Sequence, residues 1–237
     1  MKLKQKMKVR IAKYLASCGL GSRRKCEEII AMGKISINGE RITSPALNIT
    51  PGVDRVEMNG KLLEPQKKVY YLLNKPIGYT STLSDTHAKK FITELVPDDE
   101  AVWPVGRLDR ETSGLIILSN DGELTQLLTH PRYEKSKTYV ATLDKSLTPD
   151  QFERLVGGVE LDDGRLKPDD IKHLAGTDYE ITIHEGRNRL VRRTFEHFGR
   201  KVVALSRTKL SFLEIGSLKP GKYRRLNKQE IERLRNA

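Results

Sequence analysis

Four bulky aliphatic residues follow one another between a glycine and a turn signal. The run is Leu115-Ile116-Ile117-Leu118, and it lies between Gly114 and Ser119-Asn120-Asp121-Gly122. A short unbroken apolar run bounded by turn residues is typical of a buried strand. Residues 104–114 then form a glycine-bounded loop that leads into this strand. The chain must build a core around the strand, and a charged loop enters that core.

Asp109 lies within this loop, and Arg107 and Arg110 flank it. Nearby positive charge favours the ionised carboxylate, so we expect Asp109 to be anionic at neutral pH. An anionic carboxylate on a rigid loop can act as a nucleophile or a general base. The alternative is a structural ion pair with either arginine, because such pairs form similar clusters. A hydrolase that pairs Asp109 with Glu111 is disfavoured, since the arginines that keep Asp109 anionic argue against an acid–base pair.

The charge of the chain indicates a polyanionic partner. Its 237 residues include 43 Lys and Arg and 31 Asp and Glu, which gives a net charge of +12. Residues 1–62 hold 13 of the basic and 5 of the acidic residues, so this part alone carries +8. This is the electrostatic pattern of a small nucleic-acid-binding module attached to a more neutral body.

The two cysteines, Cys18 and Cys26, are too few for a disulfide framework or a structural zinc site. We expect both to be small buried apolar residues in a reducing compartment. The chain has no signal-peptide core and no apolar run that approaches a membrane span. The sequence therefore predicts a soluble, cytoplasmic protein without a metal or a cofactor.

The first part of the chain predicts two short helices followed by a hairpin. Apolar residues at near-helical spacing indicate a helix from Val9. Ser22 can cap a second helix that ends at Gly33. Its inward-facing residues would be Cys26, Ile29, Ile30 and Met32. Residues 34–39 then alternate and turn at Asn38-Gly39, which is a strong hairpin signal.

This order resembles the S4 RNA-binding domain. The resemblance rests on Ser22-Arg23-Arg24 followed by Gly33-Lys34-Ile35-Ser36-Ile37-Asn38-Gly39, and it covers about residues 9–62. Basic side chains gather at one bend, where they would neutralise phosphates and give salt-dependent affinity. The expected RNA contacts are Arg23, Arg24, Lys25 and Lys34. The alternative is a solvated basic face on a small helical domain.

The remaining residues predict a larger second domain. We expect a basic tail over residues 1–8, the first domain over 9–62, a linker over 63–68 and the second domain over 69–237. In the second domain, helices are expected over residues 122–128, 147–159 and 228–235, and strands over residues 69–73, 133–143, 179–183 and 202–210.

An arginine-rich segment, residues 185–199, predicts a helix with one buried face. The buried stripe would hold Val191, Phe195 and Phe198. Asn188 can cap this helix and Gly199 can stop it. The arginines would point away from the stripe near the helix start, where the helix dipole favours a phosphate or a carboxylate. The alternative is a solvated arginine-rich face.

Four motifs of the second domain resemble those of the pseudouridine synthases, in the RsuA/RluB branch that modifies ribosomal RNA. The first is Lys75-Pro76 with Gly78, for which we expect a structural role. The second is Gly106-Arg107-Leu108-Asp109, with Thr112-Ser113-Gly114-Leu115 and Asn120-Asp121-Gly122. The others are Lys137-Thr138-Tyr139 and Gly186-Arg187-Asn188-Arg189. Together with the first domain, the resemblance spans about residues 9–227.

The resemblance implies roles for individual residues. The catalytic aspartate of the family falls on Asp109, and the tyrosine that lies against the reacting base falls on Tyr139. The arginine that pairs with the catalytic aspartate falls on Arg192. Leu190 departs from the pattern, where a polar residue is expected. Further RNA contacts are expected from Arg107, Arg187 and Arg189.

The implied fold is α+β, with a small S4-type domain of helices and a hairpin. A larger domain follows, built on a mixed, mostly antiparallel sheet with flanking helices. The implied reaction is the isomerisation of uridine to pseudouridine in ribosomal RNA, after the base has been flipped into a pocket. Asp109 would attack the anomeric carbon or remove a ribose proton, and both options stay open.

We expect large-subunit 23S ribosomal RNA as the substrate, with small-subunit 16S RNA as the alternative. The protein would be a monomer, and its partner the ribosomal RNA or an assembling subunit. The competing function is a non-catalytic RNA-binding assembly factor. That function would be favoured if Asp109 or Arg192 had been replaced, and both are present.

Overall fold

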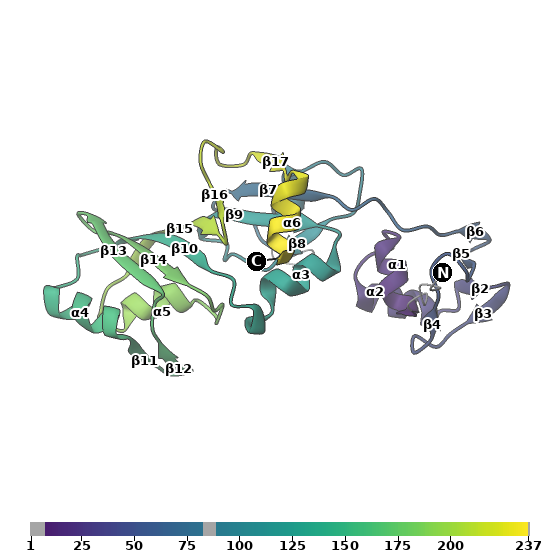
Figure 1. Ribbon diagram of the computed structural model, residues 1–237, viewed down its shortest axis with the longest axis horizontal. Coiled ribbons are helices and arrows are strands. Elements are labelled where there is room, and N and C mark those ends of the chain that lie inside the picture. Colours follow the sequence, from purple (N-terminus) through teal and green to yellow (C-terminus); the bar gives the residue numbers. More distant parts are fainter. Residues whose placement is uncertain (1–7, 83–88, 237) are drawn as a thin grey trace. The chain divides into compact units, whose positions relative to one another are not determined.

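The computed structural model describes residues 8–82 and 89–236, and the chain divides into two compact units (Figure 1). One unit is residues 1–68 with 99–101, and the other is residues 69–98 with 102–237. Of the expected basic tail, residues 1–7 lie outside the described residues. None of the helices in the described ranges has the length and apolar character needed to cross a membrane.

The helices of the N-terminal unit are α1 (Ile11–Ser17) and α2 (Arg23–Ala31), and its strands are β1 (Val9–Arg10), β2 (Ile35–Ile37), β3 (Glu40–Ile42), β4 (Asn48–Ile49), β5 (Val56–Met58) and β6 (Lys61–Leu62). The larger unit has the α-helices α3 (Gly122–Thr129), α4 (Pro149–Gly157), α5 (Leu190–Glu196) and α6 (Lys228–Asn236), and the 3₁₀ helices η1 (Ile92–Leu95) and η2 (Pro131–Tyr133). Its strands are β7 (Tyr70–Lys75), β8 (Trp103–Val105), β9 (Thr112–Ser119), β10 (Lys137–Leu143), β11 (Val159–Leu161), β12 (Gly164–Leu166), β13 (Asp170–Ala175), β14 (Asp178–Ile183), β15 (Val202–Leu210), β16 (Leu213–Glu214) and β17 (Tyr223–Arg225).

Two local signals of the first part of the sequence are confirmed, whereas the helix expected from Val9 begins at Ile11, because Val9 and Arg10 form β1 and pair with β4. Ser22 is the N-cap of α2, and its hydroxyl accepts a hydrogen bond from the N–H of Lys25 at 3.2 Å. The β2–β3 hairpin turns at Asn38-Gly39, where both residues have positive φ, 53° and 88°. This conformation is the one that a tight hairpin requires. The inward orientation expected for Met32 is wrong, because α2 ends at Ala31 and leaves Met32 56% exposed.

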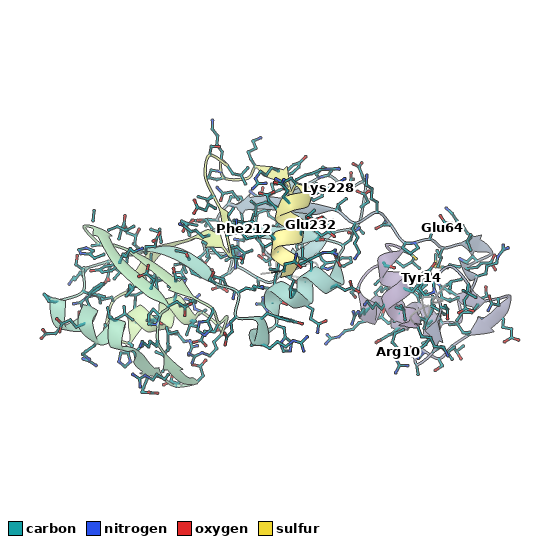
Figure 2. The ribbon with its side chains drawn as sticks, viewed as in Figure 1. Arg10, Tyr14, Glu64, Phe212, Lys228 and Glu232 are labelled. Atoms are coloured by element: carbon teal, nitrogen blue, oxygen red, sulfur yellow. The ribbon has the colours of Figure 1, made fainter. Side chains whose placement is uncertain are left out.

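Part of the expected linker is bonded into the N-terminal unit. The main chain of Leu63 donates to Val56 and accepts from the hydroxyl of Tyr14, both at 2.9 Å. The N–H of Gln66 donates to the carbonyl of Ser17 at 2.8 Å. Figure 2 shows Tyr14 beside the segment that carries Glu64. The first residues of the 63–68 segment therefore pack on α1.

The larger unit is built on a mixed, mostly antiparallel sheet, which confirms the expected fold class. Within the described residues the strand order is β13-β14-β10-β15-β9-β7-β17, with β16 beside β15 and β8 beside β9. Every pair in this sheet is antiparallel except β15 and β9, which run parallel. That parallel pair lies at the centre of the sheet and positions the candidate site.

Both faces of the sheet are buried, and β9 contributes to each. Ile116 and Leu118 pack with residues of α4 and α5 on one face. Leu115 and Ile117 pack with residues of α3 and α6 on the other. Because successive strand residues point to opposite faces, a strand between two helical layers must be apolar throughout. This explains the unbroken apolar run in the sequence.

The boundaries of several elements differ from the sequence prediction. The strand expected from residue 133 begins at Lys137, because residues 131–133 form η2. At the C-terminus, Figure 2 shows Phe212 beside α6, the helix that carries Lys228 and Glu232. The guanidinium of Arg233 lies 4.0 Å from the centre of the Phe212 ring. These contacts attach α6 to the sheet.

Candidate active site

Asp109 lies in the loop between β8 and β9, and two interior side chains hold that loop. Lys75 is fully buried at the end of β7, and its Nζ donates to the carbonyls of Asp109 (3.0 Å) and Thr112 (2.7 Å). The Oγ of Ser81 donates to the carbonyl of Leu108 at 3.0 Å and accepts from its N–H at 3.3 Å. The main chain on both sides of Asp109 is therefore fixed, which is a requirement for a precisely placed catalytic group.

Burial also changes the acidity of Lys75. It lowers the pKa of the ammonium group from 10.5 to about 8, and the charges of Asp109 and Glu111 oppose this shift. The structural role that the sequence predicts for Lys75 agrees with these contacts.

Gly114 allows β9 and β15 to approach each other directly after the Asp109 loop. Its φ is +107°, and an added Cβ would lie within 3.0 Å of main-chain atoms of Arg207. The register places Gly114 beside Arg207 and Thr112 beside Leu205. Only glycine combines this backbone conformation with such a close contact.

Arg189 is the cation that faces Asp109. Its Nη1 lies 4.0 Å from Oδ2 of Asp109 and 3.9 Å from Oε2 of Glu111. Arg107 and Arg110, the flanking arginines, form no ion pair with Asp109 in the described part of the chain. The alternative of an ion pair with a flanking arginine is thus wrong for this part of the chain, because the cation that faces Asp109 comes from a distant segment.

Arg192 does not pair with Asp109, so the expected pairing is wrong. Arg192 is 7% exposed, and its guanidinium donates to the carbonyls of Val202 (2.9 Å) and Glu111 (3.3 Å). It lies in the first turn of α5, where main-chain carbonyls accept from its Nη1 and Nη2 and its Nε has no partner among the described residues. Arg192 therefore holds the main chain next to Asp109, and Arg189 faces the carboxylate.

The start of α5 also differs from the prediction. The N-cap residue is Arg189, with a left-handed φ of 48°, and no side chain caps the helix. The capping role expected for Asn188 is wrong, because the chain enters the helix one residue later. The buried stripe is confirmed, since Val191, Phe195 and Phe198 all belong to the core.

Asp109 and Tyr139 line one cavity of about 620 Å³, a size typical of a ligand pocket. Tyr139 lies on β10, a strand of the large sheet, and is 9% exposed. Six basic residues also line the cavity: Arg107, Lys135, Lys137, Arg187, Arg189 and Arg207. Asp109 and Glu185 are its acidic residues. This excess of positive charge suits a polyanionic ligand.

The guanidinium of Arg187 is already bonded to carboxylates and carbonyls of the protein. Its guanidinium pairs with Glu185 at 2.6 Å and with Asp163 at 2.7 Å. It also donates to the carbonyls of Gly164 and Arg165. These contacts attach the β11–β12 hairpin to the segment that precedes α5. Arg187 lines the cavity, but its contacts are those of a structural side chain.

The basic residues expected to bind RNA in the N-terminal unit lie together at the start of α2. Arg23, Arg24 and Lys25 form its first turn and are exposed. Lys34, just before β2, is exposed as well. Lys25 pairs with Glu28 at 3.0 Å, and neither arginine has an ion-pair partner among the described residues. The helix N-terminus adds partial positive charge at the same place.

Comparison with known proteins gives the family of this fold and site. Residues 69–197, more than half of the chain, match the RNA pseudouridylate synthases. The chain belongs to the RNA pseudouridine synthase family. Residues 9–54 match the S4 domain, which confirms the expected domain type at the N-terminus.

Similar synthases cover almost the whole chain. An uncharacterised RNA pseudouridine synthase of Aquifex aeolicus (strain VF5) is 44% identical, over 96% of this chain and 94% of the relative. Ribosomal large subunit pseudouridine synthase B of Bacillus subtilis (strain 168) is 41% identical, over 95% of each chain. A crystal structure of a pseudouridylate synthase superposes with a TM-score of 0.69 at 29% identity, over 95% of this chain and 99% of the other.

The synthase site contains basic residues that the sequence reasoning did not select. Lys137 and Arg207 line the cavity from β10 and β15. Their sequence signal is a cation inside an otherwise apolar or alternating strand. Such a position predicts a buried charge with a specific partner or ligand.

Proposed function

We propose that this synthase isomerises uridine to pseudouridine in ribosomal RNA, with Asp109 as the catalytic residue. The observation that carries the proposal is the position of Asp109. Its carboxylate lies on a loop held by Lys75, faces Arg189, and lines a cationic cavity with Tyr139. The family supplies the reaction type, and the cavity supplies a place for one flipped nucleotide.

In this proposal the uridine leaves its stack and enters the cavity, at a cost of a few kcal/mol. RNA contacts of the basic N-terminal unit offset that cost. Asp109 then breaks the bond between N1 and the ribose, either by attacking C1′ or by taking a ribose proton. Both routes need an ionised carboxylate. Tyr139 stacks on the free uracil while it turns.

The proposed substrate is the large-subunit RNA, because a relative with 41% identity over nearly its full length is named a ribosomal large subunit synthase. The enzyme would act as a monomer on ribosomal RNA or on an assembling subunit, and so in the cytoplasm. The assembly-factor alternative predicts RNA binding without chemistry.

Pseudouridine mapping of ribosomal RNA tests the proposal. Cells that lack the protein are complemented with wild type, with Asp109→Asn, or with Glu111→Gln as a matched control. Glu111 is a neighbouring carboxylate whose side chain is 64% exposed. We expect one site in the large-subunit RNA to be lost in the deletion, restored by wild type and Glu111→Gln, and not restored by Asp109→Asn.

Two results would contradict the proposal. If no site changes in the deletion, the assembly factor becomes the better account. If Asp109→Asn restores the modification, Asp109 is not catalytic. Loss of activity in Glu111→Gln as well would instead support a paired-carboxylate mechanism.

A further inference from the structure

Arg207 is a buried cation that the proposed mechanism does not use. It lies on β15, is 3% exposed, and its Nε donates to the carbonyl of Leu115 at 2.7 Å. Its Nη2 is shielded from solvent and has no hydrogen-bond partner among the described residues. A buried N–H without a partner is destabilising, and more so in a charged group. The guanidinium therefore has a donor that no described protein group uses.

A second cation, Lys137, lies near Arg207. Its Nζ donates to the carbonyls of Lys135 and His184, at 3.0 and 3.1 Å. Burial and the charge of Arg207 lower the pKa of Lys137 to about 8, against the opposing charges of Asp169 and Glu185. Within the described ranges, no carboxylate lies within 4.0 Å of either cation. Buried Arg207 and half-buried Lys137 are like charges without a counter-ion at this distance, and such a pair favours a ligand that carries negative charge.

The sheet places Arg207 beside the residues that would handle the base. Tyr139 and Arg207 are directly paired across β10 and β15, so their side chains share one face of the sheet. On its other side Arg207 neighbours Gly114, just after the Asp109 loop. All three functional side chains line the same cavity. A nucleotide whose ribose meets Asp109 and whose ring meets Tyr139 thus has Arg207 close to its base.

We propose that Arg207 is a further catalytic residue, whose guanidinium donates to a carbonyl oxygen of the uracil and stabilises the negative charge that the free base carries. This inference rests on the proposed function. A phosphate would meet Arg107 and Arg189 first, because both are exposed at the same cavity. Arg207 is almost fully buried, so a phosphate contact is less suited to its position.

The charges balance through the reaction. When the N1–C1′ bond breaks, its electron pair stays on the uracil and spreads onto O2 and O4. The negative charge of Asp109 is consumed in its bond to C1′, or in the proton that it takes from the ribose. When C5 attacks C1′, the charge returns to Asp109, and the ring then loses its C5 proton and gains one at N1. Arg207 acts between these two events, when the charge is on the ring.

The test measures cleavage of the N1–C1′ bond in single-turnover reactions. The substrate is a transcript of the ribosomal RNA segment that mapping identifies, with uridine or 5-fluorouridine at the target. Wild type is compared with Arg207→Gln, Arg207→Lys and the control Arg200→Gln. Arg200 also donates to protein acceptors, the carbonyl of Ser146 and the side chain of Gln151, but does not line the cavity.

Arg207→Gln is expected to slow cleavage about 10²-fold, the usual effect of removing one donor to a developing anion. Its Kd for the RNA should stay within about threefold of wild type, because a base contact made mainly after cleavage adds little to binding. Fluorine at C5 stabilises the uracil anion by itself, so the defect should be smaller on 5-fluorouridine. Arg207→Lys keeps the charge and should be slowed less than about tenfold.

Four results would overturn the inference. The first is wild-type cleavage by Arg207→Gln. The second is weaker RNA binding with equal slowing on both substrates, which indicates a phosphate contact. The third is an equal loss of rate and melting temperature in the Gln and Lys variants, which indicates only the lost bond to Leu115. If Arg207→Gln does not fold, a folded Arg207→Lys that is slowed 10²-fold on both substrates also overturns it. An inactive wild type would instead contradict the proposed function.

Discussion

Lys75 shows how a single interior charge can set the position of a carboxylate that is proposed to be catalytic. Its ammonium group is shared among main-chain carbonyls of the Asp109 loop, so the loop does not depend on flexible surface contacts. Replacing Lys75 by Met leaves those carbonyls without their donor. We expect Lys75→Met to lower the free energy of unfolding by about 3–5 kcal/mol, the usual effect of removing one partner from a buried charged network. Urea denaturation measures this change.

The effect of Lys75→Met also depends on pH. The pKa of Lys75 is about 8 in the folded protein and 10.5 for an ordinary lysine. Between these values the unfolded chain binds more protons at this residue, so wild type gains stability as the pH rises from 8 to 10.5. The variant lacks this gain, and the stability difference should widen over that range. A stability difference that stays constant with pH would show that burial does not lower the pKa of Lys75. Lys172→Met, at an exposed lysine, is the control and should change stability by less than about 0.5 kcal/mol.

At the residue scale, the sequence predicted the catalytic candidates better than their partners. Asp109 and Tyr139 were found by motif, and the structure places both in one cavity. The pairing of Arg192 with Asp109 was wrong, because a guanidinium has five donors and donates to main-chain carbonyls as readily as to a carboxylate. Which acceptor is close depends on strand ends far apart in the chain. The local sequence shows Arg207 as a cation within a strand, but the groups that it contacts come from distant parts of the chain.

At the scale of elements, the β11–β12 hairpin and the start of α5 depend on one acidic residue. Asp163 lies in the hairpin turn and pairs with Arg187 and Arg193, each at 2.7 Å. These pairs lower the pKa of Asp163 from 3.8 to about 2, so their contribution is present above pH 3.8 and is lost as the pH falls toward 2. The segment held in this way ends in Arg189, which faces Asp109.

Asp163→Asn should therefore disturb the site more than the fold. We expect kcat/KM to fall about tenfold, because a small displacement of a positioning group has a large effect on rate. The melting temperature should change little, since the pairs are partly exposed. Asp162→Asn removes the neighbouring exposed carboxylate and should leave both quantities unchanged. Equal effects of the two substitutions would show that the general charge of the hairpin matters and not its pairing.

The sequence predicted those helices, turns and strands whose conformation depends on a few adjacent residues. The Ser22 cap, the Asn38-Gly39 hairpin and the buried strand at residues 115–118 each follow from a few adjacent residues. No strands were predicted at β11, β12 and β13, which contain charged and glycine residues. β11 and β12 pair with each other in a separate two-stranded sheet, and β13 pairs with β14 at the edge of the large sheet.

At the scale of the whole molecule, the residues proposed to bind the RNA backbone and the cavity proposed for the reaction lie in different units. The N-terminal unit carries exposed arginines at the start of α2, and the larger unit carries the cavity with Asp109. If the first unit supplies phosphate contacts, removing its arginines should weaken RNA binding without changing the chemical step. Such contacts appear in the salt dependence of affinity, since each neutralised phosphate releases counterions.

The variant that tests this division is Arg23→Gln with Arg24→Gln in the full chain. We expect the slope of log K against log salt to fall by about 1.4–1.8, or 0.7–0.9 for each lost phosphate contact. The single-turnover rate at saturating RNA should stay as in wild type.

The control is Arg55→Gln with Lys61→Gln, which removes the same charge elsewhere in the unit, where Arg55 already pairs with Glu57. An equal loss of slope in the control would mean that net charge alone binds the RNA. A loss confined to the α2 variant places the RNA backbone at the start of that helix, and a fall in the saturated rate would show that this unit also positions the uridine.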